Sequence, residues 1–162
     1  MNRTKMIAAA AAMITLAASA TAAATTAAAT PPTPLASQLL VRGAAGEFRL
    51  ADRDMRFFLG AGESTDIALV RATVQPGAST GWHTHEGQSM VLVEKGVLTS
   101  KEARHRKCLT NSFAAGKGFE HPEGAHNFIN NGPGELVFYV TYFLPAGAAP
   151  TPIVAPAPRA CS

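Results

Sequence analysis

Apolar and polar positions from residue 47 onward predict a domain built from short β-strands. Residues 67–74 tend to alternate between apolar and polar and end at a Gln-Pro-Gly turn. Residues 90–99 place two apolar runs around a Glu-Lys-Gly turn, which is the pattern of a β-hairpin. Residues 136–144 are β-branched and aromatic, and this stretch is long enough for a central strand. Many short strands between Gly and Pro turns indicate an all-β sandwich or barrel.

Residues near the start of the chain predict export. Residues 2–5 carry two positive charges, residues 6–16 are almost entirely apolar, and residues 18–20 form a small-residue triplet. This order is typical of a cleaved signal peptide, which we place at residues 1–20. An uncleaved anchor reaching Ala29 is the alternative, but alanine and threonine partition weakly into lipid. We therefore expect a secreted or periplasmic protein with no membrane attachment after cleavage.

The remainder of the chain divides by composition into a lead-in, one domain and a tail. Residues 21–45 are rich in Ala, Thr and Pro and predict a flexible lead-in, whereas residues 46–145 hold the strand pattern. Residues 146–162 form a Pro- and Ala-rich tail. Cys108 and Cys161 are the two cysteines, and an even number in an exported protein favours a disulfide over two free thiols. That bond would tether the tail to the domain.

Charge gives no sign of a nucleic-acid partner. Without residues 1–20 the chain keeps twelve basic and eleven acidic residues, a net charge of +1. The densest basic stretch, residues 104–107, is interpreted as a solvated loop. The basic character of the whole chain therefore does not predict binding to nucleic acid.

Two histidines provide the first candidate chemistry. His83 and His85 lie two positions apart in a strand-like segment, so their imidazoles point to the same side. Neutral imidazole is a common metal ligand, and two on one face form half a site. A single His-x-His pair also arises by chance or for packing, so this pair alone is a weak signal.

The surrounding residues resemble the two-part cupin signature over roughly residues 67–144. The residues that carry it are Gly77, His83, His85 and Gly96 in the first part and Gly116, Pro122, Gly124, His126 and Asn130 in the second. The resemblance implies a single cupin barrel, or double-stranded jelly roll, of six to eight strands. It also implies that His126 joins His83 and His85 in a three-histidine pocket. A looser similarity links the chain to small secreted single-cupin proteins with a cysteine in a proline-rich tail.

Two departures from the family pattern concern the ligand set. Ser89 stands where the family's glutamate ligand is expected, and only one residue instead of two separates Gly124 from His126. Glu86 and Gln88 have the wrong strand parity to replace that glutamate, unless a bulge at the intervening glycine turns one of them inward. Further replacements for it come from the approach to His126; these candidates are Glu120, His121 and Glu123. Gln88 and His121 are retained as candidates for a further ligand.

Three functions remain open from the sequence. The first is an exported cupin that binds a divalent transition metal, a small molecule or both; a histidine set suits zinc, iron, copper, manganese or nickel. The second is a metalloenzyme, oxygenase-like or hydrolytic, in which an open fourth position holds water. The third is a structural cupin with no metal, because a ligand is missing. By analogy with the family, a homodimer formed through edge strands is also open.

Overall fold

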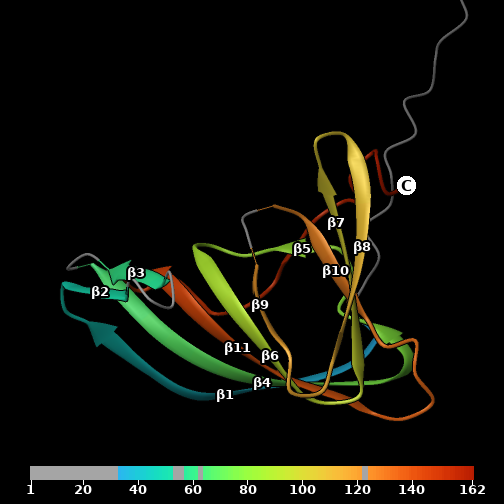
Figure 1. Cartoon of the computed structure of the whole chain (residues 1–162), viewed down its shortest axis with the longest axis horizontal. Helices are drawn as coiled ribbons and strands as arrows, with labels where there is room; N and C mark the ends of the chain where they lie inside the picture. Colours follow the sequence, from blue (N-terminus) through green and yellow to red (C-terminus); the bar gives the residue numbers. More distant parts are fainter. Residues whose placement is uncertain (1–32, 53–56, 62–63, 122–123) are drawn as a thin grey trace, which may run out of the picture.

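The computed structural model describes residues 33–52, 57–61, 64–121 and 124–162, and within these ranges every regular element is a β-strand (Figure 1). The strands are β1 (Thr33–Ala45), β2 (Phe48–Asp52), β3 (Phe57–Ala61), β4 (Thr65–Ser79), β5 (His83–Thr84), β6 (Gln88–Lys95), β7 (Val97–Arg104), β8 (Lys107–Ala114), β9 (Gly118–His121), β10 (His126–Ile129), β11 (Leu136–Pro145) and β12 (Ile153–Val154). None of the described residues belongs to a helix long and apolar enough to cross a membrane. The expected signal peptide lies outside the described residues.

Ten of the strands form one sheet that folds over on itself. Its first half runs β1-β4-β11-β6-β9 and its second half runs β8-β7-β10-β5-β12. The halves are joined where Ile129 of β10 pairs with Ser79 of β4. In Figure 1 the long strands β1, β4, β11 and β6 lie side by side, with β7, β8 and β10 in the other half. This nearly closed antiparallel barrel confirms the predicted all-β jelly roll.

The core fills the space between the halves. From Asp66 to Val74, every second side chain of β4 is buried, and Ala78 is buried near the end of the strand. On β6 the side chains of Val91 and Val93 are buried, whereas Met90 and Leu92 are exposed, as the alternation predicts. Phe138, Val140 and Tyr142 of β11 complete the wall. The face of β6 that carries Val91 and Val93 therefore points into the barrel interior.

The predicted hairpin at residues 90–99 is wrong, because β6 and β7 do not pair. β6 pairs with β11 and β9, whereas β7 pairs with β10 and β8. The chain crosses between the two halves at Gly96, where φ is 83° and an added Cβ would lie 3.2 Å from the Leu136 Cα. A short turn with a glycine at positive φ serves a crossover as well as a hairpin. The real hairpin here is β7–β8, whose turn carries the exposed His105.

The flexible lead-in expected over residues 21–45 is wrong for Thr33–Ala45, which forms β1; residues 21–32 lie outside the described residues. β1 pairs antiparallel with β4 along most of its length. Its Leu39, Leu40 and Val41 side chains are exposed, so main-chain pairing rather than an alternating apolar face holds it. The eight strands β4 to β11 form the barrel, which is within the expected six to eight. The long β1 and the short β12 are added at edges of the sheet and bring its total to ten strands.

An ion pair fastens β1 and the start of the tail to β4. The Arg42 guanidinium contacts the Asp66 carboxylate through two nitrogens, one of them at 3.0 Å. The Gly147 N–H donates to the same Asp66 oxygen at 3.0 Å. This backbone hydrogen bond, followed by the Arg42 contact, lowers the pKa of Asp66 below its usual value.

The lowered pKa of Asp66 predicts that this residue stabilises the fold at neutral pH and not at low pH. A carboxyl whose pKa is lower folded than unfolded stabilises the fold above its unfolded pKa, and this contribution is lost as the pH falls through the folded pKa. We expect Asp66→Asn to lower the Tm at pH 7 and to leave the Tm nearly unchanged, relative to wild type, near pH 2. Thermal unfolding from pH 7 to pH 2 measures the difference between the two proteins. A constant Tm difference over that range would contradict the assignment.

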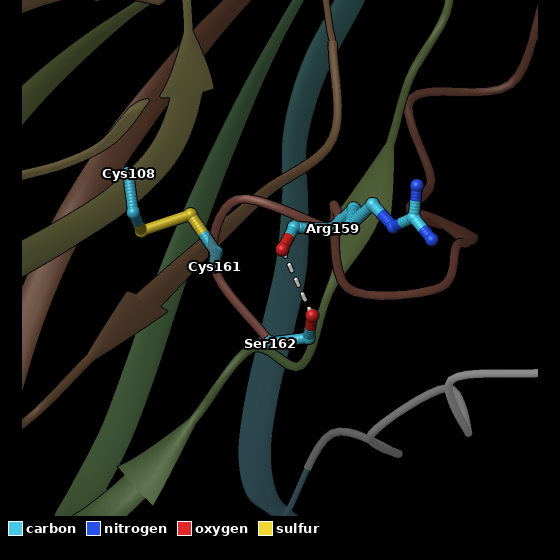
Figure 2. Close-up of a disulfide and its surroundings, with 4 residues drawn as sticks. All are labelled: Cys108, Arg159, Cys161 and Ser162. Atoms are coloured by element: carbon cyan, nitrogen blue, oxygen red, sulfur yellow. Dashed lines mark hydrogen bonds between the residues drawn. A yellow bond between two sulfur atoms is a disulfide. The ribbon is translucent and has the colours of Figure 1, made fainter. Parts of the chain in front are cut away.

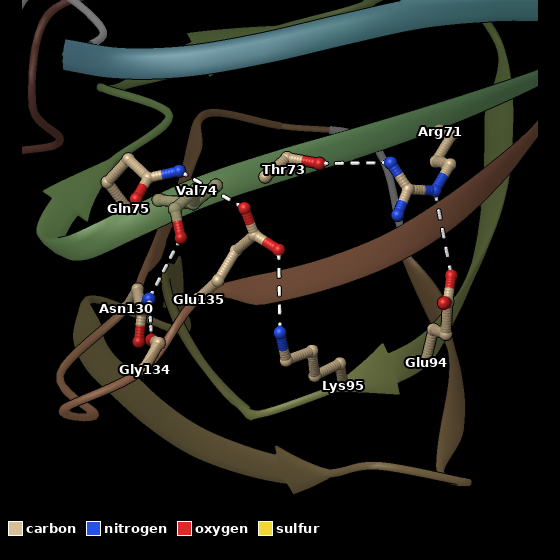
Figure 3. A network of polar contacts seen from close by, with 9 residues as sticks. All are labelled: Arg71, Thr73, Val74, Gln75, Glu94, Lys95, Asn130, Gly134 and Glu135. Atoms are coloured by element: carbon tan, nitrogen blue, oxygen red, sulfur yellow. Dashed lines mark hydrogen bonds and ion pairs between the residues drawn. The ribbon is translucent and has the colours of Figure 1, made fainter.

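Asn130, the asparagine of the second motif, has a structural role at the end of β10. Its buried amide donates to the Val74 carbonyl at 2.9 Å and the Gly134 carbonyl at 2.8 Å (Figure 3). Its Oδ1 accepts from the Gly132 N–H at 3.0 Å. Beyond this turn Glu135 meets Lys95 at 3.6 Å and accepts from Gln75 at 3.2 Å. Asn130 thus fixes the 131–134 turn between β10 and β11 against β4.

Replacing Asn130 with aspartate tests this role with almost no change of shape. Aspartate keeps the acceptor but cannot donate to the two carbonyls, and its charge would be buried facing them. We expect Asn130→Asp to lower the free energy of unfolding by about 2 kcal/mol. Urea unfolding measures this, with the exposed Asn111→Asp as the matched control. Equal losses in the two variants would contradict the assigned role.

The predicted disulfide between Cys108 and Cys161 is present. Its S–S distance is 2.02 Å and its Cα atoms are 4.9 Å apart. Figure 2 shows the bond joining β8 to the end of the chain, where the Ser162 hydroxyl donates to the Arg159 carbonyl at 3.0 Å. The tail is therefore held against the barrel, and part of it, β12, pairs with β5.

Candidate metal centre

Four histidines from both halves of the barrel meet at one end of its interior. His83 of β5 and His126 of β10 are paired across the two strands, and their ring centroids are 4.1 Å apart. The His121 ring, at the end of β9, lies 3.6 Å from the His126 ring. The His85 ring lies 5.2 Å from that of His126 and 5.7 Å from that of His121. The fold therefore brings together His83 and His126, which are some forty positions apart, as the two sequence motifs predict.

Main-chain carbonyls set the tautomer of three of these rings. The Nδ1 atom of His83 lies 2.9 Å from the Gly81 oxygen, and that of His126 lies 3.0 Å from the Gly124 oxygen. The Nδ1 atom of His85 lies 3.2 Å from the Gly87 oxygen. A carbonyl only accepts, so each Nδ1 carries the proton and each Nε2 keeps its lone pair. This is the arrangement that fixes imidazole ligands in metal sites.

His121 is the histidine with no such support. It is only 2% exposed, and neither of its ring nitrogens has a hydrogen-bond partner among the described residues. Buried polar atoms without a partner are costly and call for an explanation. One ligand atom each from His85, His121 and His126 lie within 4.8 Å of one another. A metal ion bound among these nitrogens would supply the partner that His121 lacks, so the residues present fit such an ion.

Burial favours the neutral form of all four rings. It lowers the pKa of His83 and of His85 below the usual value for histidine. Burial, followed by the charges of neighbouring histidines, lowers the pKa of His121 to about 3 and that of His126 to about 2. Neutral imidazole is the form that binds metals.

The position of the missing glutamate is occupied by a serine beside a histidine. Ser89 is buried, and its hydroxyl lies 3.4 Å from the His85 Nε2. The directly opposed residue on β9 is His121. An imidazole thus stands next to the position where the resemblance to the cupin signature predicts a carboxylate.

Gln88, the other candidate for a further ligand, lies on the outer face of β6. Its side chain is exposed, and the pairing of β6 with β11 is regular from Gln88 to Ser89 and beyond. The glycine before it, Gly87, has a φ of 70° and packs against the main chain of Phe143, where an added Cβ would lie 1.9 Å from the Phe143 oxygen. The expectation of Gln88 as a candidate ligand is therefore wrong, because the regular alternation of β6 keeps its side chain outside the barrel. Glu86 and Glu120 are exposed as well, and Glu123 lies outside the described residues.

A small cavity lies beside the histidines. Its volume is about 40 Å³, which is room for about three water molecules. Thr80, Ser89 and Tyr142 contribute polar atoms to a mostly apolar wall. The Tyr142 ring lies 5.0 Å from that of His85, and burial raises the pKa of this tyrosine to about 12, so its hydroxyl stays protonated.

Glu102 is a site residue that the sequence reading missed. Its side chain is 16% exposed, and one carboxylate oxygen lies 3.9 Å from the His121 Nε2. It sits opposite His126 in the pairing of β7 with β10. A second cavity of about 240 Å³ lies between β8 and β9 and is lined by both Glu102 and His121. Alternation along β7 was the available signal, because Leu98, Ser100 and Glu102 share one face.

Comparison with known proteins supports the fold. No family model and no curated protein matches the chain. An uncharacterized conserved protein with a double-stranded β-helix domain from Klebsiella pneumoniae is 16% identical, with a TM-score of 0.53 over 79% of this chain and 90% of that one. The Cupin_2 domain of an XRE-family transcriptional regulator from Enterobacter cloacae is 15% identical, with a TM-score of 0.48 over 68% and 97%. A cupin domain from Bordetella pertussis is 21% identical, with a TM-score of 0.46 over 70% and 96%.

Sequence identities this low support a similarity of fold and no similarity of function. The similarity to the Klebsiella pneumoniae protein, together with the two facing halves of the sheet, shows that the chain has the double-stranded β-helix fold, as a single barrel.

Proposed function

We propose that this protein binds one divalent transition metal ion in the barrel through His85, His121 and His126, with His83 as the fourth ligand. The observation that carries the proposal is the buried His121, which has no hydrogen-bond partner among the described residues and lies beside three imidazoles of fixed tautomer. An all-nitrogen set favours zinc, copper, iron or nickel, with manganese less suited, over the oxygen-seeking magnesium and calcium. His121 takes the place of the carboxylate that Ser89 cannot supply.

The cavity limits what such a site can act on. A bound ion would supply Lewis acidity and would lower the pKa of a coordinated water. The cavity of about 40 Å³ admits a water or a ligand of very few heavy atoms next to the histidines. We therefore propose small-ligand or water binding at the ion as the function, with Tyr142 in the cavity wall as the residue that would orient that ligand.

We further propose that the protein works outside the cytoplasm. A disulfide between Cys108 and Cys161 supports an oxidising compartment. The apolar start of the sequence supports removal of residues 1–20 on export. Intact-mass measurement of the protein purified from the periplasm or medium tests this: loss of residues 1–20, or of slightly more, is expected, and a full-length cytoplasmic product would contradict it.

Titration of metal-free protein tests metal binding. We expect one Co²⁺ or Zn²⁺ per chain, with the visible absorption of Co²⁺ bound to nitrogen ligands. His105→Ala is the matched control, because this exposed histidine lies in the β7–β8 turn away from the cluster, and it should bind one ion as the wild type does. Absence of binding would overturn the proposal in favour of a metal-free structural cupin, and binding that depends on His105 would overturn it by placing the ion outside the cluster.

A further inference from the structure

The tail turns back from β11 and runs across the mouth of the histidine cavity. Pro150 and Pro152 are lining residues of that cavity. Immediately afterwards β12 pairs with β5, so that Val154 lies opposite His83 and Ile153 lies opposite Thr84. A segment that the composition described only as Pro- and Ala-rich is therefore part of the site's wall.

Leu35 and Ser37 of β1 line the same cavity. Both segments that are added to the edges of the eight-stranded barrel, β1 and the tail, therefore contribute to its wall. Together they restrict the room beside the histidines.

Main-chain contacts and one covalent bond hold the tail in place. The Ala155 N–H donates to the Trp82 carbonyl at 3.0 Å, next to His83. The side chains of Ile153 and Val154 are 50% and 59% exposed, so β12 gains little from burial. A two-residue strand without buried side chains opens locally at low cost in free energy. The Cys108–Cys161 bond, which ties the far end of the tail to β8, is the strongest restraint on it (Figure 2).

We propose that tail residues 150–161 act as the size filter of the histidine site, with Pro150 and Pro152 setting the room for a ligand and the Cys108–Cys161 bond keeping the filter closed. This inference rests on the proposed metal binding. It assigns to the tail the selection of ligands: those of one to three heavy atoms reach the ion, whereas larger chelating molecules are held out until the tail moves.

Another route to the histidines is the rival explanation. The cavity of about 240 Å³ between β8 and β9 also borders His121, and it does not involve the tail. Asn111 lines this second cavity from an exposed position on β8. If ligands entered there, the tail would have no influence on access, and a bulky side chain at Asn111 would slow it.

The rate at which a bulky chelator removes zinc separates the two routes. With zinc-loaded protein and 4-(2-pyridylazo)resorcinol, we expect Cys108→Ser/Cys161→Ser to raise the removal rate at least tenfold over wild type, with one zinc still bound per chain at the start. Ala155→Pro, which removes the N–H bonded to Trp82 but keeps the disulfide, should raise it by a smaller factor. The control, Asn111→Trp, should leave it unchanged. Unchanged rates in both tail variants, or slowing by Asn111→Trp, would overturn the proposal.

A second readout does not depend on bound metal. Diethyl pyrocarbonate modifies accessible imidazoles, and we expect the cluster histidines of metal-free Cys108→Ser/Cys161→Ser to react at least tenfold faster than those of metal-free wild type, counted by peptide mass mapping. His105 serves as the internal reference, since it is exposed in both proteins. If zinc does not bind at all, the proposed function fails while this comparison still tests the tail; equal cluster reactivity in the two proteins would overturn the filter itself.

Discussion

His121→Ala is expected to weaken zinc binding by more than about 100-fold, because loss of an outer partner of a ligand already costs about 10–100-fold. His121 is the one cluster histidine with no hydrogen-bond partner for either ring nitrogen among the described residues, so the proposed metal would compensate for its burial. Competition with a chelator of known affinity measures the change. His105→Ala is the matched control: it removes an exposed histidine that is not part of the cluster, and zinc affinity should stay within a fewfold of wild type.

A second substitution that restores zinc affinity would test the role of His121 more strictly. Ser89 and His121 face each other across β6 and β9, and Ser89 stands where the resemblance to the cupin signature predicts a glutamate. We expect His121→Ala/Ser89→Glu to regain much of the zinc affinity lost in His121→Ala, since a carboxylate would again reach the other imidazoles. Unchanged affinity in His121→Ala alone would show that His121 is not a ligand.

Removing the disulfide should cause the largest loss of stability. The Cys108–Cys161 bond closes a loop with a sequence separation of 53, which corresponds to about 4 kcal/mol in the chain-entropy description. We expect Cys108→Ser/Cys161→Ser to lower the free energy of unfolding by about this amount in urea. Wild type unfolded with a reductant should match the variant. A loss below about 1 kcal/mol would show that the tail contributes almost nothing to the folded state.

The arrangement of side chains on the central strands was predictable from sequence. Alternation placed Val91 and Val93 inside and Met90 outside, and the regular pairing of β6 keeps them there. The meeting of His83 with His126 followed from the two motifs, although the second is one residue short. These features depend on strand parity and on glycine positions, both of which are local properties of the sequence.

Features that depend on register between distant strands were not predictable. The turn at Gly96 looks the same whether the chain folds back or crosses to the other half, so the crossover was missed. β1 and β12 are held by main-chain hydrogen bonds, which leave no apolar pattern. The position of His121 beside Ser89, and of Glu102 beside His121, appears only once β9 and β7 are placed.

The central claim is that imidazoles from both halves of the barrel bind a single ion. An anomalous difference map from crystals of the zinc-loaded protein, recorded at the zinc edge, tests it most directly. The account predicts one peak inside the barrel, about 2.0–2.1 Å from nitrogens of His85, His121 and His126, with His83 completing the set. A peak elsewhere on the chain, or His121 turned away from the peak towards the cavity between β8 and β9, would contradict it.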